Sequence, residues 1–273
     1  MMPCPDNDTQ PSSRNCAATF PVPLIVLAET DSTNNHLTQL CNESQPPVRE
    51  FTTLITERQT AGKGQRGNSW ESEESKNITF SFVLYPTFVE ARRQFILSQI
   101  VSLSIKEELD EWTDGISIKW PNDIYRNEKK ICGILIENDL SGSHIGRSIA
   151  GIGVNINQEV FRSNAPNPVS LKQITGQEYD RYLILANIMK RVKAYYSLLQ
   201  ADITGDAANR IAERYAHSLF RREGFHRYAD AEGDFLARLL RIESDGRLVL
   251  EDQEGKERGY RFKEVQMKFL VPR

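Results

Sequence analysis

The sequence predicts an α+β protein, in which a helix-rich main domain is followed by a small β domain. Strand and helix patterns are interspersed up to about residue 221, and two long helical patterns close this part of the chain. After Arg222 only short strand patterns remain, separated by turn residues. A chain of 273 residues can form one large domain and a small one. We therefore expect an extension over residues 1–20, a main domain over 21–221 and a β domain over 222–273.

Each element predicted in the main domain rests on a local pattern. Residues 1–20 are rich in Pro, Ser, Asn and Asp, and this composition predicts disorder. The predicted strands are runs of β-branched, aliphatic and aromatic residues: Leu24–Leu27, Phe51–Glu57, Asn77–Tyr85, Ile116–Trp120, Lys130–Glu137 and Arg147–Ile156. The predicted helices carry apolar residues near helical spacing, or follow N-cap candidates in the case of the first: Asn34–Cys41, Phe88–Trp112, Tyr179–Ala201 and Ala207–Leu219.

The β domain is predicted from turn residues as much as from strands. Asp245-Gly246 and Glu254-Gly255 are typical hairpin turns. They separate short strand patterns at Phe235–Ile242, Arg247–Glu251, Gly259–Phe262 and Glu264–Leu270. This arrangement predicts a small antiparallel barrel or ribbon.

Composition excludes several classes of protein. The 34 Lys and Arg residues are outnumbered by 37 Asp and Glu, so the whole chain does not have the charge of a nucleic-acid-binding protein. The apolar run at residues 21–28 is far shorter than the roughly 20 residues that cross a bilayer, and no basic segment precedes it. Four cysteines without a C-x-x-C pair favour reduced thiols in the cytoplasm. The four histidines lack metal-ligand spacing, which predicts no protein-bound metal.

A glycine-rich segment over residues 59–70 is the first candidate for an anion site. Its backbone amides could converge on phosphate, with positive charge beside them. The glycines and cations concerned are Gly62, Gly64, Gly67, Lys63 and Arg66. The Gly62 to Gly67 spacing matches a P-loop, but Asn68 stands where the P-loop requires lysine, which excludes that class. Taken alone, the segment is equally typical of a solvated glycine-rich turn.

A second group of polar residues is expected at one edge of the sheet. Lys119-Trp-Pro-Asn-Asp123 ends one predicted strand, and Lys130 begins the next across a turn at residues 126–129. Two lysines near one carboxylate suit an anionic ligand, because a desolvated charge needs a partner. A surface salt bridge is the alternative for each lysine taken singly, and it is the interpretation we prefer for Lys129.

Glycines inside two predicted strands indicate close approach by a ligand or by another backbone. They are Gly133 and the glycines of Gly151-Ile-Gly-Val-Asn155. Asn155 adds a side chain that both donates and accepts hydrogen bonds. A bulged core strand explains the second segment equally well.

Five ordered motifs together resemble the biotin protein ligases. They are Asp31-Ser-Thr-Asn34, Gln59-Thr-Ala-Gly-Lys-Gly-Gln-Arg-Gly67 with Trp70, Lys119-Trp-Pro-Asn-Asp123, Lys130-Ile-Cys-Gly-Ile-Leu135 and Gly151-Ile-Gly-Val-Asn155. The resemblance covers residues 22–220 strongly and the C-terminal part weakly. It implies a mixed sheet with flanking helices, related to class II aminoacyl-tRNA synthetases, followed by a small SH3-like β-barrel. Many family members carry arginine where this chain has Gln65 and Asn68.

The resemblance implies a two-step ligation and a role for each motif residue. Biotin and ATP, with Mg²⁺, would form biotinyl-5′-AMP, and a lysine of a biotin carboxyl carrier domain would then take the biotinyl group. The implied catalytic residues are Lys130, Lys63 and Arg66. The implied biotin-binding residues are Ser32, Thr33, Asn34, Gln59, Lys63, Gly64, Gln65, Lys130 and Gly133. The implied ATP- and adenylate-binding residues are Gly62, Lys63, Arg66, Trp70, Lys119, Asn122, Asp123, Lys130 and Asn155. For Trp70, plain core packing is nearly as good an interpretation as contact with adenine.

Several alternatives stay open at the level of sequence. Lipoate ligation or octanoyl transfer uses a related fold, and a non-catalytic biotin- or carrier-binding module or a nucleic-acid-binding protein are candidates from other classes. About twenty low-complexity residues precede the core, so we expect neither a helix-turn-helix domain nor DNA-binding repressor activity. The resemblance is compatible with a monomer or a homodimer.

Overall fold

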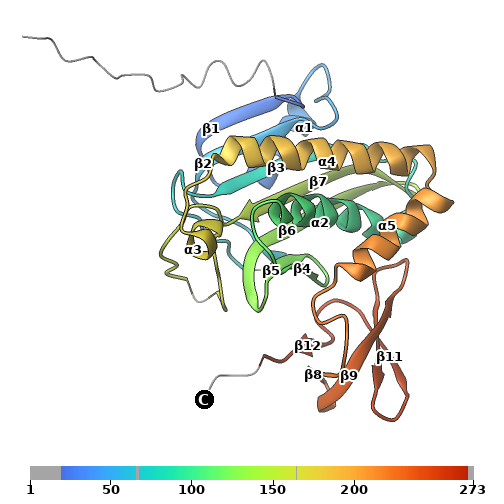
Figure 1. Cartoon of the computed structure of the whole chain (residues 1–273). Helices are drawn as coiled ribbons and strands as arrows, with labels where there is room; N and C mark the ends of the chain where they lie inside the picture. The colour runs from blue at the N-terminus through green and yellow to red at the C-terminus, as the bar shows by residue number, and fades with distance from the viewer. Residues whose placement is uncertain (1–19, 66–67, 164, 270–273) are drawn as a thin grey trace, which may run out of the picture.

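A seven-stranded mixed sheet forms the main body of the molecule (Figure 1). The computed structural model describes residues 20–65, 68–163 and 165–269, so the expected disordered extension falls outside the described chain except for Phe20. The strand order is β1-β2-β3-β7-β6-β5-β4; β1 and β2 are parallel and the other neighbours are antiparallel. The strands are β1 (Leu24–Thr30), β2 (Thr53–Gln59), β3 (Ile78–Leu84), β4 (Ile116–Lys119), β5 (Asp123–Arg126), β6 (Lys129–Ser141) and β7 (His144–Val154). The expected mixed sheet with flanking helices is therefore confirmed.

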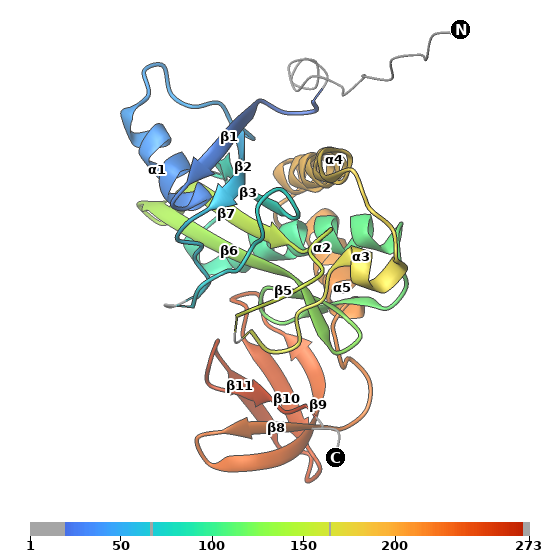
Figure 2. The same cartoon turned by 90° about the vertical axis from the view of Figure 1, so that its left-hand side faces the viewer.

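Helices cover both faces of this sheet (Figure 2). They are α1 (Thr33–Glu43), α2 (Phe95–Asp110), α3 (Leu171–Thr175), α4 (Arg181–Ala201) and α5 (Asp206–His217). Leu37 of α1 packs on Val83 of β3, whereas Phe80 and Phe82 of the same strand face the core beneath α2 and α4. Successive residues of a strand point to opposite faces, so β3 separates two apolar layers. None of the helices in the described chain is long and apolar enough to cross a membrane.

The helix expected over Phe88–Trp112 begins only at Phe95. The chain before it is held by the start of β7: the Ile145 N–H donates to the Val89 carbonyl at 3.0 Å, and the Ala91 N–H donates to the Ser143 carbonyl at 2.9 Å. A 3₁₀ turn, η2 (Ala91–Arg93), then leads into α2. Pairing with a neighbouring strand overrides the helical spacing here, and spacing alone does not reveal it.

One additional strand, β5, lies inside the hairpin that the sequence predicts between Ile116–Trp120 and Lys130–Glu137. The chain reverses after β4 at Pro121, so that Asp123 pairs with Lys119. It reverses again at Asn127, whose φ of 51° is tolerated by asparagine, and this confirms the expected turn. The double reversal places Asp123 between the strands that carry Lys119 and Lys130.

A second sheet of five antiparallel strands follows α5, in the order β11-β10-β9-β8-β12. Its strands are β8 (His226–Asp230), β9 (Gly233–Ile242), β10 (Leu248–Asp252), β11 (Glu257–Tyr260) and β12 (Gln266–Met267). The two predicted hairpin turns are present, whereas β8 is not predicted by the sequence. Within the described residues the edge strands β11 and β12 do not pair, so the expected closed barrel is not observed and the sheet is open.

Trp120 joins the two sheets. Its indole Nε1 donates to the carbonyl of Gly246 at 2.9 Å, and its ring meets Phe262 edge-on with centroids 6.3 Å apart. The residues between α5 and β8 also run beside β4, where the Phe220 N–H donates to the Ile118 carbonyl at 2.8 Å. These contacts seat the second sheet at the edge of the first that carries β4 and β5.

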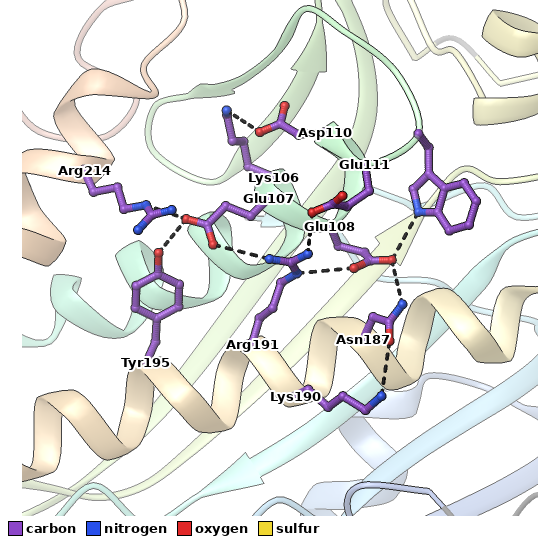
Figure 3. Close-up of polar contacts among 11 residues, drawn as sticks. Lys106, Glu107, Glu108, Asp110, Glu111, Asn187, Lys190, Arg191, Tyr195 and Arg214 are labelled. Atoms are coloured by element: carbon purple, nitrogen blue, oxygen red, sulfur yellow. Dashed lines mark hydrogen bonds and ion pairs between the residues drawn. The ribbon is translucent and has the colours of Figure 1, made fainter.

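Acidic residues of α2 connect this helix to α4 and α5 on the same face of the sheet (Figure 3). The buried Glu108 carboxylate accepts from Trp112 Nε1 at 3.1 Å and from Arg191 Nε of α4 at 3.3 Å. Glu107 accepts from Arg214 of α5 at 2.7 Å. The buried Glu108 carboxylate fixes the position of α4 relative to α2, because its donor from α4 would lose its hydrogen-bond acceptor if the helices moved apart.

Replacing Glu108 by alanine should lower the free energy of unfolding by about 2 kcal/mol, because an indole N–H and a partly buried guanidinium lose an acceptor. The matched control is Glu111→Ala: Glu111 also pairs with Arg191, at 2.9 Å, but is 63% exposed. The control should cost less than about 1 kcal/mol. Urea unfolding followed by circular dichroism measures both values, and equal losses would contradict the role of Glu108.

Candidate active site

The predicted cluster of lysines lies in one cleft of about 780 Å³. Lys63, Lys119 and Lys130 all line it, together with residues from the second sheet. The sequence-predicted residues that line the cleft are Ser32, Thr33, Asn34, Gln59, Lys63, Gly64, Gln65, Trp70, Lys119, Asn122, Asp123, Lys130 and Gly133. Gly62 and Asn155 are not among the lining residues, and Arg66 and Gly67 lie outside the described residues.

A polar pocket forms where α1 begins and β2 ends. Because β1 and β2 are parallel, their carboxyl ends meet at the same edge, and Gln59 lies beside the start of α1. The Gln59 Oε1 atom accepts from the Thr33 N–H at 2.9 Å. Ser32 occupies the N-cap position of α1 and is buried, but its side chain makes no capping hydrogen bond. The pocket therefore holds prearranged polar groups at a helix N-terminus.

Two residues that the sequence analysis did not identify fix this pocket. The Ser81 hydroxyl is hydrogen bonded to Thr33 Oγ1 at 2.7 Å and to Asn34 Oδ1 at 2.6 Å. The Asn34 amide donates to Glu137 Oε2 at 2.8 Å. Ser81 could have been recognised in the sequence, because it is a polar residue in the middle of a mostly apolar strand, and that strand is buried throughout. Glu137 could not, because a glutamate at the exposed end of a strand is common.

The glycines of β6 and β7 make room for Trp70. Gly133 and Gly153 are directly paired across the two strands. A Cβ atom at Gly153 would come within 2.2 Å of Trp70 Cε2, and one at Gly133 within 2.8 Å of Trp70 Cζ3. The indole therefore packs against the glycines, and its buried Nε1 has no hydrogen-bond partner among the described residues. The ring packs on the sheet and also lines the cleft, and its contact with adenine stays a prediction.

Two backbone amides of the glycine-rich loop donate within the loop itself. The Gly64 N–H donates to the Asn68 carbonyl at 2.6 Å, and the Trp70 N–H donates to the Gly62 carbonyl at 2.9 Å. Gly62 is needed for packing, since a Cβ atom there would lie 2.4 Å from the Trp70 carbonyl oxygen. Among the described residues of the loop, Lys63 supplies the positive charge to the cleft.

Asp123 and two lysines form the charged end of the cleft. Lys130 Nζ lies 2.7 Å from Asp123 Oδ1 and 5.5 Å from the centre of a Trp70 ring. Burial lowers the pKa of Lys119, and the charges of Lys130 and Arg221 lower it further, whereas Asp123 opposes the shift. One carboxylate faces several cations, so the site electrostatically favours an anionic ligand.

Asn155 directly follows β7, two residues after Gly153, although it does not line the cleft. Its amide nitrogen donates to the Val169 carbonyl at 3.2 Å, while its buried Oδ1 has no partner in the described part of the chain. A buried acceptor without a partner requires an explanation, and a bound donor is one.

Part of the cleft wall comes from the second sheet, which the sequence analysis assigned no site residues. Phe262, Lys263, Val265, Gln266, Met267 and Phe269 line the cleft opposite the motif residues. The sequence analysis did not identify these residues, because they form no recognisable motif and line the cleft only as a result of how the two sheets pack.

The family is established by comparison with known proteins. The model of the biotin/lipoate A/B protein ligase family matches residues 26–155. The bifunctional ligase/repressor BirA of Bacillus spizizenii is 30% identical over 243 residues, which cover 85% of this chain and 70% of that protein. The biotin–[acetyl-CoA-carboxylase] ligase of Paracoccus denitrificans is 32% identical over 162 residues, or 57% of this chain and 65% of that protein.

Solved structures lead to the same conclusion. The biotin protein ligase from Aquifex aeolicus, described in complex with biotin and ATP, superposes with a TM-score of 0.73 at 29% identity and covers 90% of this chain and 98% of that one. The fold is thus that of the biotin protein ligases. The chain belongs to the biotin/lipoate A/B protein ligase family, and the resemblance inferred from its motifs is confirmed.

Changing Gly153 to alanine should displace Trp70, because the new methyl group would overlap the indole. We expect greater quenching of tryptophan fluorescence by acrylamide and a loss of stability of about 1–3 kcal/mol. Gly259→Ala is the control, since a Cβ atom there meets nothing within 4 Å. Unchanged quenching in Gly153→Ala would mean that the indole does not rest on this glycine.

Proposed function

We propose that the cleft joins biotin to ATP, giving biotinyl-5′-AMP and pyrophosphate, and then transfers the biotinyl group to a lysine of a biotin carboxyl carrier domain. The observation that carries this proposal is the convergence of Lys63, Lys119 and Lys130 on one cleft beside the polar pocket of Gln59. The Aquifex aeolicus relative, whose structure is described with biotin and ATP, supports the choice of substrates.

The polar pocket is the proposed site for the biotin ring. Ser32, Thr33, Asn34 and Gln59 offer hydroxyl and amide groups suited to a ureido group, which both donates and accepts hydrogen bonds. Hydrogen bonds with Ser81 and Glu137 hold the side chains of Thr33 and Asn34 in place before the ligand arrives, which lowers the entropic cost of binding. Lys63, Gly64, Gln65 and Gly133 would line the path from the ring to the reacting carboxylate.

The charged end is the proposed site for ATP and the adenylate. Trp70 packs against the glycines and lines the cleft, and its ring is the proposed surface for the adenine base. Asn155 stays in this proposal because its buried Oδ1 lacks a partner among the described residues. Lys119, Asn122 and Asp123 would surround the phosphates, Gly62 would act through loop packing, and Arg66 is carried over from the family motif alone. Mg²⁺ would enter with ATP as part of the substrate.

Lys130 is the proposed centre of charge stabilisation. In the first step a carboxylate oxygen of biotin forms a bond to the α-phosphorus, the bond to the bridging oxygen breaks, and pyrophosphate leaves with the electron pair. Negative charge develops on the α-phosphate oxygens in the transition state, where a fixed ammonium is most effective. The ion pair with Asp123 holds the Lys130 ammonium in position. In the second step the carrier amine attacks the acyl carbon and AMP leaves.

The proposal also covers the second sheet, the acceptor protein, the cellular location and the oligomeric state. We infer that the open sheet after α5 corresponds to the SH3-like module of the family. The carrier domain as acceptor, a cytoplasmic location, a monomeric or homodimeric state and the absence of nucleic-acid partners remain predictions.

Pyrophosphate release measured with ATP and biotin tests the proposed activity and its main alternative. We expect release with biotin to exceed release with lipoate or octanoate by at least about 100-fold, because a site built for ureido hydrogen bonds leaves buried polar groups unpaired with the other acids. Faster turnover of lipoate or octanoate would reassign the chain within its family.

Substituting Lys130 by alanine should reduce biotinyl transfer by at least about 100-fold, since a charge aimed at the transition state is lost. Lys129→Ala is the matched control, because Lys129 is the adjacent residue and is exposed. Transfer of labelled biotin to a carrier domain measures the effect, with circular dichroism to confirm folding. Near-normal transfer by the Lys130 variant would refute its assigned role.

A further inference from the structure

Lys119 is held in the cleft by aromatic rings. Its ammonium nitrogen lies 5.1 Å from the centre of the Tyr125 ring and 5.9 Å from the centre of the Phe269 ring. The carboxylate of Asp123 is bonded instead to Lys130. Among the described residues, no carboxylate lies within ion-pair distance of Lys119. The charge of Asp123 still favours the ammonium form, and the two rings are the groups in direct contact with that ammonium.

Phe269 reaches Lys119 from the far end of the chain. Its ring stacks on Tyr125 with centroids 6.1 Å apart and an interplanar angle of 12°. It also lies 6.1 Å from Phe220, on the side away from the cleft lining. The ring is thus part of a three-ring stack between the last described residues of the chain and the first sheet.

Arg221 fixes the segment that carries Phe269. Its guanidinium lies 4.8 Å from the Phe269 ring, and its NH1 group donates to the Lys268 carbonyl at 2.7 Å. The Lys268 N–H donates to the Arg227 carbonyl at 3.0 Å. The position of Phe269 is therefore set by backbone hydrogen bonds on one side and by ring stacking on the other.

We propose that Phe269 is a positioning residue for ATP: together with Tyr125 it holds the Lys119 ammonium in the cleft without neutralising its charge. The inference rests on the proposed function, since it takes Lys119 as a ligand of the ATP phosphates. A carboxylate in the place of the ring would hold the lysine equally well but would cancel part of the charge that the phosphates need. An aromatic face attracts the ammonium through its quadrupole and leaves the net charge at +1.

The sharpest test removes the ring but keeps apolar volume. Phe269→Leu and Phe269→Met are the ring-free variants, Phe269→Tyr restores the ring, and Phe220→Leu is the matched control from the same stack. Calorimetry with α,β-methylene-ATP in the presence of biotin measures nucleotide affinity without turnover, and a separate titration measures biotin affinity. Thermal unfolding shows that each variant is folded.

We expect both ring-free variants to bind the nucleotide analogue about tenfold more weakly, with unchanged biotin affinity. Phe269→Tyr and Phe220→Leu should bind it like the original protein. Unchanged affinity in the ring-free variants, or an equal loss in Phe220→Leu, would overturn the proposal. Absence of pyrophosphate release from the original protein would instead contradict the proposed function, because the calorimetric result does not depend on turnover.

Discussion

An excess of positive charge in a partly buried cleft is the constraint on which the rest of the site depends. Lys63, Lys119 and Lys130 share this cleft, and Asp123 is paired with only one of them, Lys130. Like charges in such a place are unfavourable without an anion, which is why burial and neighbouring cations lower the pKa of Lys119. A phosphate-bearing ligand would relieve this repulsion, because its negative charge would lie among the lysines.

Three local features of the fold bring the residues of the cleft together. Two tight reversals around β5 set Asp123 between the strands of Lys119 and Lys130. The paired glycines of β6 and β7 have no side chains, so the Trp70 ring can pack directly against these two strands. The parallel pairing of β1 with β2 brings Gln59 to the start of α1. Each of these features is local, and residues from the C-terminal part of the chain also line the cleft.

Much of this site could be predicted from the sequence, because the motifs carry residue types with strong chemical preferences. The lysines and the glycines of β6 and β7 were identified in this way, whereas the polar residues at the start of α1 were identified through the resemblance to the family. The convergence of loop amides on an anion stays a prediction, and two of the described amides, those of Gly64 and Trp70, donate within the loop. The spacing of the glycines shows where the backbone can adopt unusual conformations, but it does not show which acceptors the backbone N–H groups bind.

The features that the sequence did not reveal depend on contacts between distant segments. Ser81 and Glu137 join the pocket through side-chain hydrogen bonds that span 47 and 103 residues. Phe269 reaches Lys119 only through the packing of the second sheet on the first. Strand patterns and turns left a barrel and an open ribbon as alternatives, because they predict hairpins without saying whether the edge strands pair.

The central claim is that the lysine-lined end of the cleft binds the phosphate of an acyl-adenylate. A crystal structure with biotinol-5′-AMP, a stable phosphodiester analogue, tests it most directly. The account predicts the phosphate within hydrogen-bond distance of Lys130 and at least one of Lys63 and Lys119, with the bicyclic ring beside Gln59. A phosphate that points into solvent, or a ligand bound elsewhere on the molecule, would contradict it.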